Sequence, residues 1–466
     1  MKGFTSSGSS VRFRGRAWLC AASLAVANPA LATADEAVIT NGPAAGSHSA
    51  WTVAQSGPGD PLRVTPASTL QQLIAEALKN NPEIAAASHE KEAAGHRISP
   101  AGALDDPMFE AGLINVPIQP LRLNREDMTM KMLGISQRFP YPGKRALREE
   151  VAAKDAESAG FGYRETVNRV VRDIKVTFYD LALVERSIEV VERNRTLVEQ
   201  LLRIAEGRYS VGQGAQADLL RAQTQLAKMS EELLRMRRER RTMQADLARA
   251  VGRSGEGAPT LSVMPGLDAP LSPAEELRET ALRNRPQLLG LKTLIDKGQK
   301  ALDLARKDYY PDFDVRFQYG LRERDLDAMR RPDVFSLTVA INLPVWGKQK
   351  LDPKVAEAQA MREQAISMYQ AQENELVAKL RQQAAIAEQS RESAKLYETG
   401  ILPQARLALE SALAAYRVNR VDFPMLLDSQ MSVLNYEVNH AAAVVAYNKA
   451  LAEIDQLTGK SLAGAR

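Results

Sequence analysis

The sequence predicts a mainly α-helical protein with membrane-type β-strands, built as an internal duplication. Three observations carry this prediction. Landmarks recur along the chain at a constant spacing, each half contains two segments in which apolar and polar residues alternate, and each half contains very long helical segments. A recurrence of this kind indicates a repeat architecture in which each half is one structural unit.

The N-terminus has the pattern of a secretory signal peptide. Four basic residues and no acidic residue occupy the first sixteen positions, and a largely apolar run follows. Small residues favour cleavage after Ala32 or Ala34, so residues 1–34 are predicted to be a signal peptide and 35–67 an N-terminal leader. Cleavage would remove Cys20, the only cysteine. A lipid-acceptor role for Cys20 stays open, although large side chains precede it.

The composition argues against several classes of protein. Lys and Arg number 61 against 57 Asp and Glu, a balance that does not favour nucleic-acid binding. Gly459 opens a Gly-Lys-Ser sequence, but the glycine that a phosphate-binding loop needs five residues earlier is absent. His89 and His96 lie too far apart on a helix to share a metal. The sequence therefore predicts no enzyme, no cofactor and no metal site.

The duplication is explicit in the sequence. Residues 77–84 (ALKNNPEI) recur as residues 281–288 (ALRNRPQL), 204 positions later. The same spacing relates later landmarks, namely Pro107 to Pro311, Pro140 to Pro344, and Gly143-Lys144 to Gly347-Lys348. Chance does not maintain one register over so many residues.

Further along, the spacing between matching landmarks grows to 207. It relates Tyr209 to Tyr416 and Gly252 to Gly459, so three residues are gained within the long helical segment between. These registers predict repeat 1 at 68–252, a linker or equatorial segment at 253–272, repeat 2 at 273–460 and a tail at 461–466.

Each repeat contains a pair of predicted strands. Apolar and polar residues alternate over 312–321 and 335–343 in repeat 2, and more weakly over 107–115 and 129–139 in repeat 1. About ten residues is the length that a tilted strand needs to cross a bilayer. Three methionines also alternate from Met128 to Met132. We interpret them as packing residues, with a copper-binding ladder as the less favoured alternative.

Four strands are too few to close a barrel, and an open sheet edge is not tolerated in lipid because its backbone groups stay unpaired. The barrel must then be shared between copies of the chain. Two copies would give eight strands and an interior filled by side chains, whereas three give twelve strands and room for an aqueous lumen.

The predicted helices are unusually long. Helices at 69–102 and 273–306 precede the strand pairs, and helical hairpins at 143–251 and 347–458 follow them. The return helix of the first hairpin carries a heptad pattern, formed by Leu219, Ala222, Leu226, Met229, Leu233, Met236, Met243, Leu247 and Ala250. This pattern predicts a coiled coil, and residues in the stripe are core positions.

The order of a helix, two strands and a long helical hairpin, given twice after a signal peptide, resembles the TolC family of outer-membrane factors. The resemblance covers residues 68–460. Its most specific parts are residues 137–145 (QRFPYPGKR) and the hairpin tip at 209–223 (YSVGQGAQADLLRAQ).

This resemblance implies a homotrimer with a twelve-stranded barrel in the outer membrane of a Gram-negative bacterium. An α-helical coiled-coil barrel would continue it across the periplasm. The expected function is the exit duct of a tripartite efflux system, with a periplasmic membrane-fusion adaptor and an inner-membrane pump of the resistance-nodulation-division (RND) type as partners. The Pro-Tyr-Pro-Gly-Lys-Arg sequence at 140–145 looks closest to the heavy-metal branch.

Other functions stay open at this point. Drug efflux and type I protein secretion use the same kind of duct. A soluble periplasmic coiled-coil adaptor is a further alternative, but it leaves the four alternating strands unexplained.

The resemblance also implies a gate at the periplasmic ends of the hairpins. Asp218, Tyr416 and Asp428 match tip positions that form polar links or an acidic ring in the family, and Asp422 is a further candidate. Aspartates repeated by threefold symmetry around a narrow pore would favour cations. The alternative for Asp218 and Asp422 is capping of the returning helices. Met425 replaces a second acid of the family pattern.

The resemblance assigns adaptor contacts to the two hairpin tips. The residues concerned are Val211, Gly212 and Gln213 in the first tip and Val418, Asn419 and Arg420 in the second. Arg420 is displaced by one position from the usual arginine of the family. Because the tips differ in sequence, a ring of adaptors would meet two alternating kinds of contact.

Overall fold

The computed structural model describes residues 69–118, 123, 126–253, 266–267, 271–324 and 329–460. Every described residue belongs to one compact unit, Arg63–Arg466, which is called the second unit below. The predicted signal peptide, the leader, most of the linker and the tail lie outside the described residues. No helix among the described residues is long and apolar enough to cross a membrane.

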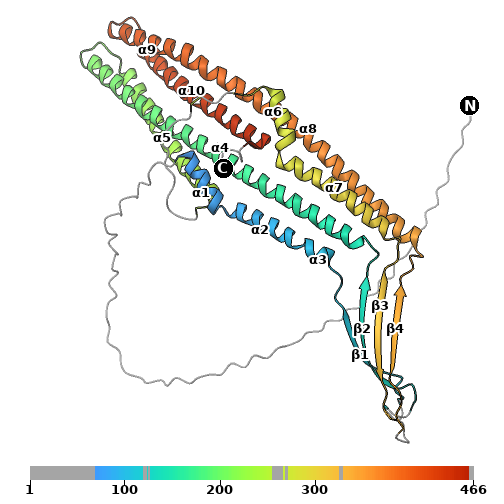
Figure 1. Ribbon diagram of the computed structural model, residues 1–466. Helices are drawn as coiled ribbons and strands as arrows, with labels where there is room; N and C mark the ends of the chain where they lie inside the picture. Colours follow the sequence, from blue (N-terminus) through green and yellow to red (C-terminus); the bar gives the residue numbers. More distant parts are fainter. Residues whose placement is uncertain are drawn as a thin grey trace, which may run out of the picture. The chain divides into compact units, whose positions relative to one another are not determined.

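The second unit is mainly helical, as predicted, and it contains one small sheet (Figure 1). The elements of its first half are α1 (Leu70–Asn80), α2 (Pro82–His96), α3 (Ile98–Gly102), β1 (Met108–Ile114), β2 (Met130–Phe139), α4 (Lys144–Ser210) and α5 (Gln216–Val251). Those of its second half are α6 (Ala274–Asn284), α7 (Pro286–Lys307), β3 (Phe313–Leu321), β4 (Val334–Ile341), the π-helix η1 (Gly347–Leu351), α8 (Asp352–Leu396), the π-helix η2 (Tyr397–Ile401), α9 (Leu402–Arg417) and α10 (Phe423–Thr458).

The four strands form one antiparallel sheet in the order β1-β2-β3-β4. The central pairing joins the two halves of the chain, from Lys131 opposite Leu321 to Phe139 opposite Phe313. Strands β1 and β4 are the two edges. Figure 1 shows the strands side by side beyond one end of the long helices, with the hairpin tips at the other end.

One face of the sheet is apolar and exposed. A row of directly paired residues crosses all four strands on this face, formed by Phe109, Ile135, Phe317 and Leu337. The opposite face is polar and includes an ion pair between Arg316 and Glu110. Met130 lies on the polar side and its sulfur packs against Gly320, which is the packing role expected of a flexible side chain.

The outgoing helix differs between the halves. In the first half it is one uninterrupted helix of 67 residues, α4. In the second half η1 begins the outgoing helix and η2 interrupts it between α8 and α9, each with an amide that bonds five residues back, from Asp352 to Gly347 and from Leu402 to Tyr397. Pro353 and Pro403 follow these turns and cannot donate an α-helical hydrogen bond. Because a π turn holds an extra residue, both turns accommodate part of the three-residue gain.

Matching contacts hold each hairpin to the short helices of its own half. The return helices α5 and α10 end at Gly252 and Gly459, both with positive φ, at 87° and 72°. A Cβ there would lie 2.7 Å from the carbonyl oxygen of Asn80 and 2.8 Å from that of Asn284, respectively. Only glycine allows the end of each return helix to pack this closely on the corner between two short helices.

The Pro-Tyr-Pro-Gly-Lys-Arg segment forms a buried ion cluster where the sheet meets the helices. Lys144 Nζ donates to Asp312 Oδ1 at 2.7 Å and to the carbonyl of Tyr310 at 2.9 Å. The backbone amide of Tyr141 donates to the same carboxylate at 2.9 Å, and Arg138 to its other oxygen at 3.2 Å. This segment therefore fastens β2 and α4 of the first half to the start of β3 in the second.

Candidate functional site

The two hairpin tips share one backbone conformation. In the first tip the amides of Gly212 and Gln213 donate to the carbonyls of Tyr209 and Arg208 at 3.0 and 2.9 Å. In the second the amides of Asn419 and Arg420 donate to Tyr416 and Ala415 at 3.2 and 2.9 Å. Each pair of bonds is a Schellman motif, the usual way to end a helix and turn the chain.

The residue that turns the chain is left-handed in both tips. Gly212 has φ 75° and Asn419 has φ 62°. Asparagine is the residue that most readily replaces glycine in this conformation. The sequence difference between the tips at this position therefore leaves the path of the backbone unchanged.

The matched tyrosines of the two tips have different surroundings. Tyr416 is 4% exposed, whereas Tyr209 is 46% exposed. The ring of Tyr416 packs against Phe423 with centroids 5.7 Å apart, and the guanidinium of Arg208 lies 4.4 Å from the ring centroid. Arg208 comes from the first half, so it covers a tyrosine of the second half.

Arg208 also fastens the two tips through the backbone. One of its terminal nitrogens donates to the carbonyl of Tyr416, and the other donates to the carbonyl of Gln213 at 3.3 Å. The first bond adds a side-chain donor to a carbonyl in the last turn of α9 that also accepts the amide of Asn419. Sequence reasoning missed Arg208, although it directly precedes Tyr209 in the most family-like segment of the chain.

Asp218 and Tyr416 lie in one electrostatic environment. Burial raises the pKa of the Tyr416 phenol, and the carboxylate of Asp218 raises it further, against the opposing effect of Arg208. The phenol therefore stays protonated and uncharged at neutral pH. Asp218 is half-buried in the first turn of α5.

Helix capping does not account for either candidate aspartate. Asp422 occupies the N-cap position of α10, but its side chain makes no capping hydrogen bond. The N-cap of α5 is Ala215, so Asp218 lies inside the helix. Neither carboxylate thus makes an N-cap hydrogen bond to its helix in the structure.

The remaining candidates lie outside the cluster around Tyr416. Three of them are exposed, namely Asp422, Asp428 and Arg420. Among the described residues, no side-chain interaction is found between these three and Tyr416 or Arg208. The structure thus brings Asp218 and Tyr416 together and leaves the other two acids at the surface. Asp428 follows the buried Leu427 on α10.

The proposed adaptor contacts are surface residues. Val211 and Val418 hold matched positions and are 66% and 63% exposed. The other members of this set are also exposed, namely Gly212, Gln213, Asn419 and Arg420. Both valines are thus exposed apolar residues at the ends of the two long hairpins.

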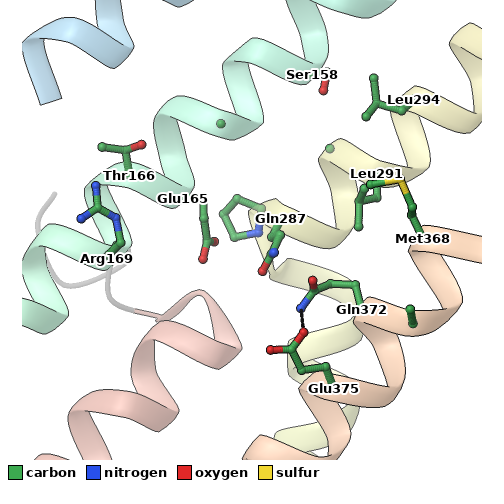
Figure 2. A pocket seen from close by; sticks show the side chains of 14 residues that line it. Ser158, Glu165, Thr166, Arg169, Gln287, Leu291, Leu294, Met368, Gln372 and Glu375 are labelled. Carbon is green, nitrogen blue, oxygen red and sulfur yellow. Dashed lines mark hydrogen bonds between the residues drawn. The ribbon is translucent and has the colours of Figure 1, made fainter. Parts of the chain in front are cut away.

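A separate cavity of about 520 Å³ lies between α4, α7 and α8, away from the tips (Figure 2). Its charged lining residues are Glu165, Arg169 and Glu375. The buried Arg285 lies 3.6 Å from Glu165. Among the described residues, no group of three or more His, Cys, Asp or Glu side chains could hold a metal ion.

A duplicated pair of helical hairpins joined through one four-stranded sheet is the architecture found in outer-membrane channel proteins. The sequence model described as "Outer membrane efflux protein" matches residues 73–253 and 277–460. The chain belongs to this family. Its members are outer-membrane channels, and the chain is accordingly not an enzyme.

Solved structures show the same fold. The outer membrane protein VceC from Vibrio cholerae is 18% identical, with a TM-score of 0.70 over 84% of this chain and 96% of that chain. The outer-membrane channel OprN is 16% identical, with a TM-score of 0.72 over 86% and 98%. The open state of the Neisseria gonorrhoeae MtrE channel is 16% identical, with a TM-score of 0.69 over 84% and 88%. No curated protein sequence matches the chain.

Proposed function

We propose that the chain forms the exit duct of a tripartite efflux system as a homotrimer. The carrying observation is the sheet, which has one apolar exposed face and two free edges in a single chain. Three copies would pair edge to edge into twelve strands, and the helical hairpins would continue the wall as an α-helical barrel. This arrangement leaves no strand edge unpaired in lipid.

The hairpin tips are the proposed periplasmic end of this duct. Val211 and Val418 would contact a membrane-fusion adaptor, which would join the duct to an inner-membrane pump of the RND type. The shared backbone of the tips supports this proposal, because it would present six similar contact points in a trimer. Their different residues, Gln213 and Arg420, would make alternate contacts differ in charge.

The gate is proposed to combine a buried lock and exposed acids. Arg208 and Tyr416 would hold the two tips together within each chain, and Asp218 lies beside them. Asp422 and Asp428 would form the acidic surface that a cation meets first. Carboxylates repeated around a narrow opening concentrate negative potential and favour cations.

Heavy-metal cations are the proposed cargo on this basis. The support comes from the acids at the tips, since Lys144 of the Pro-Tyr-Pro-Gly-Lys-Arg segment is buried in an ion cluster and is not placed to select cargo. Drug efflux and protein secretion are the alternatives. A deletion strain would be complemented and tested for growth with copper, cobalt, zinc, cadmium and a drug panel. Restored tolerance to drugs alone would overturn the cation proposal.

The duct itself has a direct test. The protein should fractionate with the outer membrane and migrate on gels as a trimer that heat converts to monomer. A monomer in the soluble periplasmic fraction would contradict the proposal.

For the gate, Asp428→Ala should reduce cation block of reconstituted channels, and Ser429→Ala, at the next position, should leave it unchanged. Equal conductance and block in both variants would remove Asp428 from the gate.

A further inference from the structure

Where the sheet meets the helices, a buried lysine of the first half binds two acids of the second half. Lys144 follows β2, its side chain is 3% exposed, and it reaches Asp312 at 2.7 Å and Asp308 at 3.7 Å. Both acids belong to the second half, between the end of α7 and β3. The inner pair of strands, β2 and β3, is thus joined by backbone pairing and by a buried charge cluster above it.

The duplication supplies the two sides of a second junction of this kind. Lys348 follows β4 and lies 204 positions after Lys144. Asp105 and Asp106 precede β1, between the positions that match Asp308 and Asp312. The side chains of Lys348, Asp105 and Asp106 are exposed, and no ion pair is found for them among the described residues.

These two sides cannot meet in one chain. Strands β1 and β4 are opposite edges of the sheet, with β2 and β3 between them. β4 can pair with β1, as β2 pairs with β3, only when the two strands come from adjacent copies. The opposite charges then face each other across the boundary between copies.

We propose that Lys348 of one copy binds Asp105 and Asp106 of the adjacent copy, as Lys144 binds Asp308 and Asp312 within the chain. This proposal rests on the proposed assembly into a closed ring. Each boundary would carry one such charge cluster, at the level where sheet and helices meet. The partner is a second copy of this chain.

Two other charge pairs between the halves have lysines that are not repeated, in contrast to Lys144 and Lys348. Between α7 and α4, Lys297 pairs with Asp155 at 2.7 Å and Lys300 with Glu150 at 2.8 Å. At the matching positions of α2, the first half has alanine and histidine instead of lysine. The junction lysine is kept in both halves, whereas these helix lysines are kept in one.

The residues beside Lys348 fit the same boundary. Val345 and Trp346 are large, apolar and exposed in the single chain, and so are Leu104 and Met108 on the other side. Within the chain Tyr141, the match of Val345, stacks on Tyr310, the match of Asp106, so the inner junction also has an apolar surround. An apolar surround reduces the competition of water for the charge pair and so strengthens it.

The test measures how firmly copies hold together in the full-length protein purified in detergent. Lys348→Glu should raise the dissociation equilibrium constant of the trimer roughly tenfold, a change of about 1.4 kcal/mol, at the temperature where half of the wild-type trimer has dissociated. Replacing both Asp105 and Asp106 by Lys should have a similar effect. Combining the three substitutions should restore most of the wild-type stability. Lys350→Glu, an equal charge change at an exposed position, is the control and should change little.

The outcomes separate this proposal from the one on which it rests. A wild-type protein that forms no trimer overturns the proposed duct. A wild-type trimer with unaffected Lys348→Glu, or a combined variant that is not restored, overturns only the charge pair. A combined variant that is not restored would be expected if Lys348 instead binds a lipid phosphate.

A crosslinking experiment protects the test against misfolded variants. In a Cys20→Ser background, Lys348→Cys together with Asp106→Cys should give covalent dimers and trimers with a short bis-maleimide reagent. The Lys348→Cys variant alone should give none. Because the two positions lie at opposite edges of one sheet, a crosslink between them has to join two copies. Absence of crosslinks in a trimeric double variant would overturn the proposal.

Discussion

Tyr209 and Tyr416 hold the same place in the two halves of the chain, but only Tyr416 is buried. The backbone at the two tips is the same, with a Schellman motif and a left-handed residue in each. The difference comes from neighbours, because Phe423 and Arg208 cover the second tyrosine. Duplication thus copied the local conformation, and packing between the halves made the copies unequal.

The junction lysines repeat this lesson at the other end of the helices. Lys144 is buried against two acids, whereas Lys348 is exposed in the single chain. In both comparisons one member of the pair faces the other half and its match faces outward. Such outward members are the ones available to other copies or to partner proteins.

Removing the buried junction lysine should have the largest effect on stability. Lys144→Ala leaves the carboxylate of Asp312 buried without its closest partner, which should cost about 4 kcal/mol. The matched variant Lys348→Ala should cost about 1 kcal/mol or less, because its side chain is exposed in the single chain and can pair only between copies. Denaturant unfolding followed by the helical circular dichroism signal compares the two. Equal losses would mean that the two junctions are equally buried in the assembled protein.

The matched tyrosines should differ almost as strongly. Tyr416→Ala removes a buried ring from the cluster between the hairpins and should cost about 3 kcal/mol. Tyr209→Ala removes a half-exposed ring and should stay within about 0.5 kcal/mol of wild type. The same unfolding measurement applies, and channel leakage provides a second readout at the tips. A Tyr209 variant as unstable as the Tyr416 variant would contradict the asymmetry.

Much of the fold could be predicted from the sequence because it follows from local patterns. The alternation of Phe317 and Tyr319 with polar residues predicted a strand with one apolar face, and the mainly helical fold with four strands is confirmed. The π turns could not be predicted in detail. Pro403 marked an interruption, but proline allows a kink, a break or a wider turn.

The candidate site was less accessible to sequence reasoning. Tyr416 was named through the resemblance to the family, and its match to Tyr209 gives no reason for one tyrosine to be buried and the other not. Arg208 was missed because its role depends on a carbonyl about two hundred residues away in the chain. Asp422 shows the converse problem, since its position suggested capping that the structure does not contain.

The two hairpins also differ in a set of ion pairs whose contribution to stability depends on pH. Glu437 of α10 accepts hydrogen bonds from Arg406 and Arg193, and its side chain is 11% exposed. Burial alone would raise its pKa, but the two arginines outweigh burial and hold the pKa below the ordinary value. The matching position in the first half is Ser230, which cannot make these ion pairs.

Glu437→Gln should therefore lower stability at neutral pH by about 1 kcal/mol. Because the pKa is depressed in the folded chain, the contribution of Glu437 is present above pH 4.5 and declines as the pH falls through the folded pKa. Wild type and variant should accordingly converge in acid. Ser230→Ala should show no such pH dependence, and a constant gap between wild type and the Glu437 variant would contradict the assignment.

The smallest expected effects test whether the two tips truly share a backbone. A Cβ added to Gly212 meets nothing within 4 Å, so Gly212→Ala should cost about 1 kcal/mol through its left-handed conformation alone. Gly207, in the helix four residues before Val211, also has nothing within 4 Å of an added Cβ. Gly207→Ala should stabilise the protein by up to ~1 kcal/mol, because alanine favours a helix.

In the second tip, Asn419→Gly should change stability by a few tenths of a kcal/mol at most. Opposite signs for Gly212 and Gly207 would isolate backbone conformation as the cause, whereas a large loss from Asn419→Gly would show that the asparagine side chain has a role that glycine lacks.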